Sequence, residues 1–408
     1  MKRLVIYNIM AMILSLVMVM CTELPHSQTP VDKDPPLSLN NIRIESLPGG
    51  AKITYDVANE EDISYVKAEY TYKGEKKIVR SSIFNNFLKI EGLGSVEPVE
   101  VTLYVIDHSE NSSVGITTVF TPDTPPVETI FESLEISQMF GGPYVTFDNA
   151  TETEVGVTLF VIDSDGVMHE RETHYSKEKQ GEITFRGYNP IEYHFAVHIT
   201  DKWGNVSRTK DAVITPLFER DLDKTKFLAV ELPGDNTTVF WTFDITQIWD
   251  GDDDTFWVTQ SGFGPYPQYF TIDVGVVVRF SRFRVRARTN QYYCDNVPKT
   301  FEVWGAADYK KGKPETYWTG DEWKTDGDWE MLGDYELNRP SGNTEEICGP
   351  TGVDKEEAVK GFMYNIPANK KVLRYVRFIV KTSWTEGGTE IRLGELNFYG
   401  DDGSSYIE

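Results

Sequence analysis

Short runs in which apolar and polar residues alternate constrain the fold of this chain more than any other feature. Two of them cover residues 51–57 and 65–72, and turn-forming residues such as Gly and Asn lie beside them. A period of two gives a β-strand one apolar face, whereas an amphipathic helix needs a period of about 3.6. Only residues 354–360 have weak helical character. The sequence therefore predicts an all-β protein.

A repeated motif divides the first half of the chain. Residues 107–113 and 201–207 share the pattern D-x-x-x-N-x-S, and each copy follows an apolar alternating run. The copies are separated by about 100 residues, the length of one β-sandwich domain. The run at residues 157–163 corresponds to residues 65–72 of the first repeat. We therefore predict two tandem sandwiches of the immunoglobulin or fibronectin type III class.

The chain of 408 residues is too long for one hydrophobic core. Prolines at positions 122, 125 and 126 mark the boundary between the two repeats, and Pro216 ends the second. A larger C-terminal domain follows, with an expected insertion over residues 308–361. The expected segments are a signal peptide (1–20), a lipidated cysteine and tether (21–36), domain 1 (37–122), domain 2 (126–216) and domain 3 (217–408).

The N-terminus has the pattern of an export signal. Two basic residues precede an apolar run that ends at Met20, and Cys21 follows directly. A cysteine in this place resembles the lipidation site of a bacterial lipoprotein, although Met20 departs from the usual small residue. The resemblance implies an outer-membrane protein held by its lipid and displayed at the cell surface. An ordinary secretory signal with an incidental cysteine is the alternative.

Charge and cysteine content limit the partners and the covalent structure. The net charge of −24 disfavours binding to nucleic acid or to an anionic membrane surface. Two cysteines, Cys294 and Cys348, remain after the signal. An even pair in an exported protein predicts one disulfide bond, with two free buried thiols as the alternative. Trp203 is the only tryptophan outside the C-terminal half.

An acidic loop lies between Trp249 and Trp257. It contains four aspartates, at positions 250, 252, 253 and 254. Carboxylates this close repel one another unless water or a cation compensates them, and oxygen ligands on a tight loop suit Ca²⁺. A solvated acidic turn with Asx hydrogen bonds is the alternative.

Five segments in domain 3 resemble the discoidin family, also called coagulation-factor type C or galactose-binding-like domains. They are residues 249–257, 267–275, 301–305, 374–378 and 394–400, in the order in which the family has them. The resemblance implies a jelly-roll β-sandwich. It also implies a structural Ca²⁺ ion, whose ligands would be the Gln247 carbonyl, Asp250, Asp252, Thr255, the Gly394 carbonyl and Glu395.

Discoidin domains bind ligands at loops at one end of the sandwich, and sugar recognition needs an aromatic face with planar polar groups. The candidate ligand-binding residues are Arg288, Asn290, Tyr292, Tyr293, Trp384, Phe263 and Tyr266. Packing of these loops against one another is the alternative. Val258 stands where galactose-binding relatives often have a histidine, so galactose specificity is not implied.

The sequence gives no indication of catalysis. Domain 3 has no histidine, which removes Ser-His-Asp and Cys-His arrangements there. His169 and His174 are five residues apart, and on a strand they would point to opposite faces. We therefore predict no catalytic residues and no enzymatic activity.

The layout as a whole resembles surface lipoproteins encoded with glycan-uptake systems in anaerobic Gram-negative bacteria. The resemblance implies a non-catalytic protein that binds a polysaccharide or oligosaccharide, with an outer-membrane transporter as a further partner. An adhesion or assembly protein that binds another protein through domain 3 is the alternative. An accessory subunit of a glycosidase or lyase is the third hypothesis.

Overall fold

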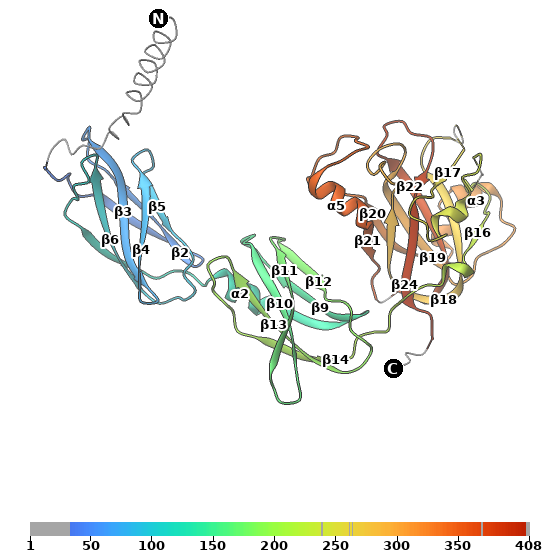
Figure 1. The fold of residues 1–408 in the computed structure, drawn as a ribbon, viewed down its shortest axis with the longest axis horizontal. Helices are drawn as coiled ribbons and strands as arrows, with labels where there is room; N and C mark the ends of the chain where they lie inside the picture. Colours follow the sequence, from blue (N-terminus) through green and yellow to red (C-terminus); the bar gives the residue numbers. More distant parts are fainter. Residues whose placement is uncertain (1–32, 238–239, 261, 263, 369, 405–408) are drawn as a thin grey trace, which may run out of the picture.

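The computed structural model describes residues 33–237, 240–260, 262, 264–368 and 370–404. The expected signal peptide, Cys21 and Phe263 lie outside these residues. Three groups of β-strands follow one another along the chain (Figure 1). The prediction of an all-β protein with two tandem sandwiches and a jelly roll is confirmed by the strand order described below. Within the described ranges, no helix is long and apolar enough to cross a membrane.

Domain 1 has the strand order of a fibronectin type III sandwich. One sheet has the order β1-β2-β5 and the other β4-β3-β6-β7. Side chains that alternate along β3 and β6, such as Val66 and Leu103, are buried between the sheets. The strands are β1 (Asn40–Leu47), β2 (Gly50–Asp56), β3 (Ile63–Tyr72), β4 (Glu75–Ser82), β5 (Phe87–Ile90), β6 (Val99–Asp107) and β7 (Ile116–Phe120).

Domain 2 repeats this architecture, with sheets β8-β9-β12 and β11-β10-β13-β14. Strand β10 therefore corresponds to β3, in agreement with the phase of the repeat. The elements are α2 (Pro126–Ser133), β8 (Glu135–Met139), β9 (Gly142–Asp148), β10 (Val155–Ile162), β11 (Met168–Ser176), β12 (Gln180–Thr184), β13 (Tyr193–Asp201) and β14 (Lys210–Ile214). Helix α2 was not predicted. It begins at the proline pair and buries Val127 and Ile130 against the core.

The D-x-x-x-N-x-S motif forms the same turn in both domains. In domain 2, Asp201 Oδ1 accepts hydrogen bonds from the backbone N–H groups of Trp203 (2.9 Å) and Asn205 (2.9 Å). The Asn205 side chain donates to Asp201 Oδ2 at 2.9 Å. The Ser207 hydroxyl accepts from the Ile199 N–H at 2.9 Å. Each position that the two copies of the motif share thus satisfies a backbone or side-chain group of the turn.

Domain 3 is a jelly roll built around one long strand, β18 (Gln268–Arg286). Its first half pairs with β22 and its second half with β24, so it passes through both layers of the sandwich. The sheet order is β15-β24-β18-β22-β19-β20, and β16 and β21 also pair with β18. The other elements are β15 (Arg220–Asp221), η1 (Lys224–Lys226), β16 (Leu228–Val230), η2 (Ile245–Ile248), β17 (Trp257–Val258), β19 (Pro298–Ala306), β20 (Trp329–Glu336), β21 (Phe362–Asn365), β22 (Leu373–Ser383), β23 (Arg392–Leu393) and β24 (Glu395–Asp401).

The expected insertion, residues 308–361, is folded and packs on the jelly roll. It contributes the short helices α3 (Glu315–Thr319) and α4 (Glu322–Thr325), strand β20 and helix α5 (Gly352–Lys360). Trp318 and Trp323 from this segment cover Arg377 of β22, whose side chain is fully buried and forms an ion pair with Asp235 at 2.8 Å. The insertion therefore completes a second hydrophobic cluster beside the main core.

Candidate functional site

Loops from distant parts of domain 3 meet at one end of the sandwich. Strand pairing brings the start of β19 beside the end of β22, where Pro298 pairs with Ser383. The Trp384 N–H donates to the Val297 carbonyl at 3.0 Å. The structure joins Cys294 and Cys348 in a disulfide bond with an S–S distance of 1.99 Å. These connections hold the segments after β18, before α5 and after β22 together.

A pocket of about 640 Å³ opens among these loops, and we call it the loop-end pocket. Its volume lies within the range of about 300–1,000 Å³ that is usual for small-molecule sites. Its lining combines two aromatic rings with many hydroxyl and charged groups. The lining residues are Tyr266, Lys299, Thr300, Thr344, Glu345, Glu346, Thr382, Ser383, Trp384, Thr385, Glu386 and Gly387.

The polar groups of the pocket are held by hydrogen bonds. Glu346 Oε1 accepts from the Thr385 hydroxyl at 2.6 Å and from the Asp295 N–H at 3.2 Å. The Tyr266 hydroxyl donates to the Glu390 carbonyl, and burial raises its pKa to about 12. The phenol therefore stays protonated at neutral pH and acts as a fixed hydrogen-bond donor.

Trp384 lines the pocket. Its side chain is largely buried, and its ring packs edge-to-face on Tyr293 with centroids 5.3 Å apart. The Lys299 ammonium lies 4.4 Å from the centre of the indole ring, within cation–π range. The indole Nε1 has no hydrogen-bond partner among the described residues. A half-buried lysine side chain thus lies over the aromatic ring.

The seven candidate ligand residues fall into separate groups. Trp384 and Tyr266 line the loop-end pocket, and Phe263 lies outside the described residues. Tyr292 and Tyr293 are only 3% and 0% exposed, so their rings offer no open face in this structure. They pack in a cluster with Leu337, Phe362 and Trp384 and support the pocket from below.

Arg288 and Asn290 lie beside the acidic loop and do not line the pocket. The Arg288 guanidinium is 3.7 Å from the centre of the Phe256 ring and donates to Gln291 at 2.8 Å. The intervening Thr289 hydroxyl donates to the Asp253 carbonyl at 3.1 Å. Asn290 is exposed at the tip of the turn.

Lys299, Glu346 and Glu386 were not predicted as site residues. Lys299 follows the first residue of β19, and Glu346 lies in the insertion two positions before Cys348. The only local signal was the cysteine, because a disulfide to Cys294 places this part of the insertion beside the predicted loop.

Oxygen atoms of the acidic loop converge on the Thr255 hydroxyl. Oγ1 lies 2.9 and 3.0 Å from the two carboxylate oxygens of Asp250. It is also 2.9 Å from the Asp252 carbonyl and 3.3 Å from the Gln247 carbonyl. A hydroxyl has one proton and can donate fully to only one of these acceptors. The surplus of acceptors suits a cation with oxygen ligands.

Glu395 brings the last strand to the same region. Its carboxylate is 1% exposed, and Oε2 has no hydrogen-bond partner in the described part of the chain. Burial raises the pKa of Glu395, and the nearby charge of Asp250 adds to this effect. The hydrogen bond and charge of Lys224 lower the pKa but do not cancel the rise. The Lys224 ammonium forms an ion pair with Oε1. A lysine therefore supplies the positive charge next to this carboxylate.

Not all the expected calcium ligands come together. The described residues contain no group of three or more His, Cys, Asp or Glu side chains suited to a metal. Asp252 is exposed, and its Oδ1 accepts from the Asp254 N–H at 3.0 Å in a local turn. The buried Gly394 donates its N–H to the Arg286 carbonyl at 2.8 Å. The oxygen atoms that already lie near one another are therefore the Thr255 hydroxyl, the Gln247 and Asp252 carbonyls, and the carboxylates of Asp250 and Glu395.

The fold defines a three-domain β protein with a jelly-roll C-terminal domain. Three family models match it in succession. Residues 36–122 match a domain of unknown function, DUF4959. Residues 123–225 match DUF5126 and residues 249–400 match DUF5000, both also described as domains of unknown function. No curated protein matches the chain at a significant level.

Solved structures with similar parts include a SusE-like protein, which is 26% identical, covers 68% of this chain and 99% of its own, and has a TM-score of 0.42. CBM32-3 from a family 31 glycoside hydrolase of Clostridium perfringens is 16% identical, with 44% of this chain and 94% of its own covered and a TM-score of 0.32. A two-domain fibronectin type III segment of chicken tenascin is 9% identical, with 43% and 98% covered and a TM-score of 0.22.

Proposed function

We propose that this protein binds carbohydrate non-catalytically at the loop-end pocket of domain 3. The observation that carries the proposal is the lining of that pocket, where the Trp384 indole lies among five hydroxyl-bearing Ser and Thr residues and the charged groups of Lys299, Glu346 and Glu386. Sugars present an apolar ring face and several hydroxyls, and such a lining can satisfy both.

Displacement of Lys299 would open the aromatic surface. The lysine side chain is flexible, and its ammonium rests on the indole without an ion-pair partner among the described residues. A sugar ring that takes this place would pack on Trp384, while the displaced ammonium could donate to a hydroxyl. Glu346 would stay fixed by Thr385 and accept from another hydroxyl.

We propose that the protein acts as a surface lipoprotein in polysaccharide capture. Cys21, after the apolar N-terminal run, would carry the lipid, and domains 1 and 2 would hold domain 3 away from the outer membrane. Domain 3 has no histidine, which supports binding without turnover. The glycan would be held for other proteins to transport or cleave.

We also propose a structural Ca²⁺ ion in the acidic loop. The acceptors around Thr255 and the unpaired Oε2 of Glu395 fit such an ion. Asp250, the Gln247 carbonyl, Thr255 and Glu395 would hold it, and Asp252 and the Gly394 carbonyl would complete the set after a local rearrangement. The bound ion would connect the loop to β24 and stabilise the fold. Lys224 would then leave Glu395.

A glycan array tests the main proposal, with the soluble chain that begins after Cys21 and with calcium present. We expect one class of polysaccharide to be retained. The double variant Lys299→Ala/Glu386→Gln should lose it, while Lys360→Ala/Glu356→Gln, which changes the same residue types on exposed parts of α5, should keep it. A blank array would refute the proposal, and a sugar-independent complex with a membrane transporter in a pull-down would replace it with protein binding.

A further inference from the structure

A second pocket lies at the junction of domains 1 and 2, outside the site described above. The turn between β13 and β14 of domain 2, residues 201–205, packs on the segment after β5 of domain 1, residues 91–94. We call this contact the junction and the adjoining cavity of about 390 Å³ the junction pocket. Its lining residues are Tyr70, Tyr72, Lys73, Glu75, Lys77, Glu91, Gly92, Leu93 and Trp203.

Direct contacts fix the two domains at the junction. The Asn205 side chain donates to the Gly92 carbonyl at 3.1 Å and accepts from the Lys73 ammonium at 3.2 Å. A Cβ atom on Gly92 would lie 2.6 Å from the Trp203 ring, so the indole rests directly on the Gly92 backbone. The Gly94 N–H donates to the Tyr72 hydroxyl at 2.6 Å. The walls of the pocket are therefore held in place.

Trp203 is more than a structural residue of its turn. The corresponding turn of domain 1 makes the same Asp, Asn and Ser hydrogen bonds with Ser109 in this position. The turn itself therefore does not require an aromatic residue. Trp203 remains 43% exposed although it packs on domain 1. Part of the Trp203 side chain is therefore accessible to a ligand.

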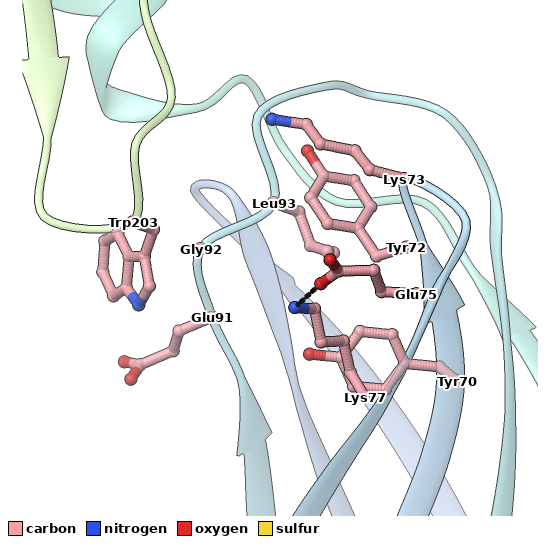
Figure 2. A pocket seen from close by; sticks show the side chains of 9 residues that line it. All are labelled: Tyr70, Tyr72, Lys73, Glu75, Lys77, Glu91, Gly92, Leu93 and Trp203. Atoms are coloured by element: carbon pink, nitrogen blue, oxygen red, sulfur yellow. Dashed lines mark hydrogen bonds and ion pairs between the residues drawn. The ribbon is translucent and has the colours of Figure 1, made fainter.

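The polar groups of the junction pocket are balanced in charge. Lys77 forms an ion pair with Glu75 at 2.5 Å, and Lys73 is bound to Asn205. Glu91 makes no hydrogen bond or ion pair with any described residue. In Figure 2, the Glu91 side chain extends toward the Trp203 side of Gly92, and the tyrosines and lysines lie on the other side. Two cationic and two anionic groups favour an uncharged, hydroxyl-rich ligand over an anion or a cation.

In the junction pocket and in the loop-end pocket, a lysine ammonium lies over the tryptophan ring of the lining. The exposed Lys202 ammonium lies 4.5 Å from the Trp203 ring centre, as Lys299 does at 4.4 Å from Trp384. A sugar ring could displace either lysine and pack on the indole. We propose that the junction pocket is a second carbohydrate-binding site, which takes a neutral oligosaccharide across Gly92 between Trp203 and the tyrosines of domain 1. Only the class of ligand rests on the function proposed for domain 3.

The test uses the whole chain after Cys21, labelled with 5-fluorotryptophan. Each of the nine tryptophans contributes one fluorine resonance, and Trp203→Phe assigns the one at the junction. The probes are neutral malto-, cello-, manno- and galacto-configured hexasaccharides. We expect at least one of them to shift the Trp203 resonance in a saturable manner in the Lys299→Ala/Glu386→Gln background. Glu91→Gln, which leaves the junction contacts intact, should weaken this binding at least tenfold.

Val206→Ala is the matched control, because Val206 directly follows the turn, is exposed and does not line the pocket. It should leave the titration unchanged. If no hexasaccharide shifts the Trp203 resonance, or if Glu91→Gln and Val206→Ala behave alike, the second site is refuted. In the chain without the Lys299→Ala/Glu386→Gln changes, a Trp203 shift with no shift of the Trp384 resonance would count against the loop-end site instead, so failures of the two sites are distinguishable.

Discussion

Replacement of Arg377 by methionine should destabilise domain 3 in a way that depends on pH. Arg377 and Asp235 form an ion pair in which both side chains are 0% exposed. The guanidinium also lies 4.8–5.3 Å from the ring centres of Tyr269, Trp318 and Trp323. Methionine keeps much of the packing volume but leaves the buried carboxyl without its partner. Breaking such a pair typically costs about 3–5 kcal/mol at neutral pH.

The pKa of Asp235 determines how this loss changes with pH. Burial raises the pKa from 3.8 to about 6, although Arg377 and Thr271 act in the opposite direction. Between these two values the folded state holds a proton that the unfolded state has released, so this group stabilises the fold less as pH rises. The full difference between the two pKa values corresponds to about 3 kcal/mol of folding free energy. Without Arg377 the pKa of Asp235 in the folded state rises further, so the loss of stability with rising pH continues above pH 6.

The destabilisation by Arg377→Met should therefore be largest at pH 7.5 and smaller by about 2 kcal/mol at pH 5, where the carboxyl is mostly protonated in both proteins. Urea unfolding followed by tryptophan fluorescence measures it, because eight of the nine tryptophans are in domain 3. Arg374→Met removes a pair of the same type with Asp273, but Arg374 is 39% exposed. We expect a loss below about 1 kcal/mol there. Equal losses for both variants, or a loss independent of pH, would refute this reasoning.

Three further predictions concern the loop, the disulfide and the junction. Added Ca²⁺ should raise the midpoint of domain 3 unfolding, and EDTA should reverse the increase. Glu395→Gln should abolish the response to Ca²⁺. At a Ca²⁺ concentration of a hundred times Kd, the gain in the free energy of unfolding is about 2.7 kcal/mol. Removal of the Cys294–Cys348 bond by Cys348→Ser should cost about 2–4 kcal/mol in urea unfolding, because it closes a loop spanning 54 positions; no change would contradict this. Gly92→Ala should widen the distribution of interdomain distances in small-angle scattering, whereas Gly74→Ala, also at positive φ but in open space, should not.

The local pattern of the sequence was sufficient for most of the fold. Alternating runs predicted the strands, and the repeated motif predicted equivalent turns because its Asp, Asn and Ser side chains satisfy the turn themselves. Helix α2 was missed, since Pro125 and Pro126 look like a linker. Proline is nevertheless tolerated in the first turn of a helix, where its missing N–H has no partner to lose.

The site was harder to predict because its parts are distant in the sequence. The sequence predicts that Tyr292 and Tyr293 contact the ligand as loop aromatics, but loop aromatics also pack on one another, and here they support Trp384. Lys299 and Glu346 reach the pocket through strand pairing and the disulfide, which no local pattern reveals. The junction pocket depends on how two domains contact each other, and a single-domain pattern contains no information about that.

Calorimetric titration of the soluble chain with the glycan that it retains tests the central claim most directly. We expect saturable binding in the millimolar to micromolar range, weakened at least tenfold, or by about 1.4 kcal/mol, in Lys299→Ala/Glu386→Gln. The control Lys360→Ala/Glu356→Gln should bind as the unchanged protein does. Equal affinity in all three proteins would show that the loop-end pocket is not the carbohydrate site.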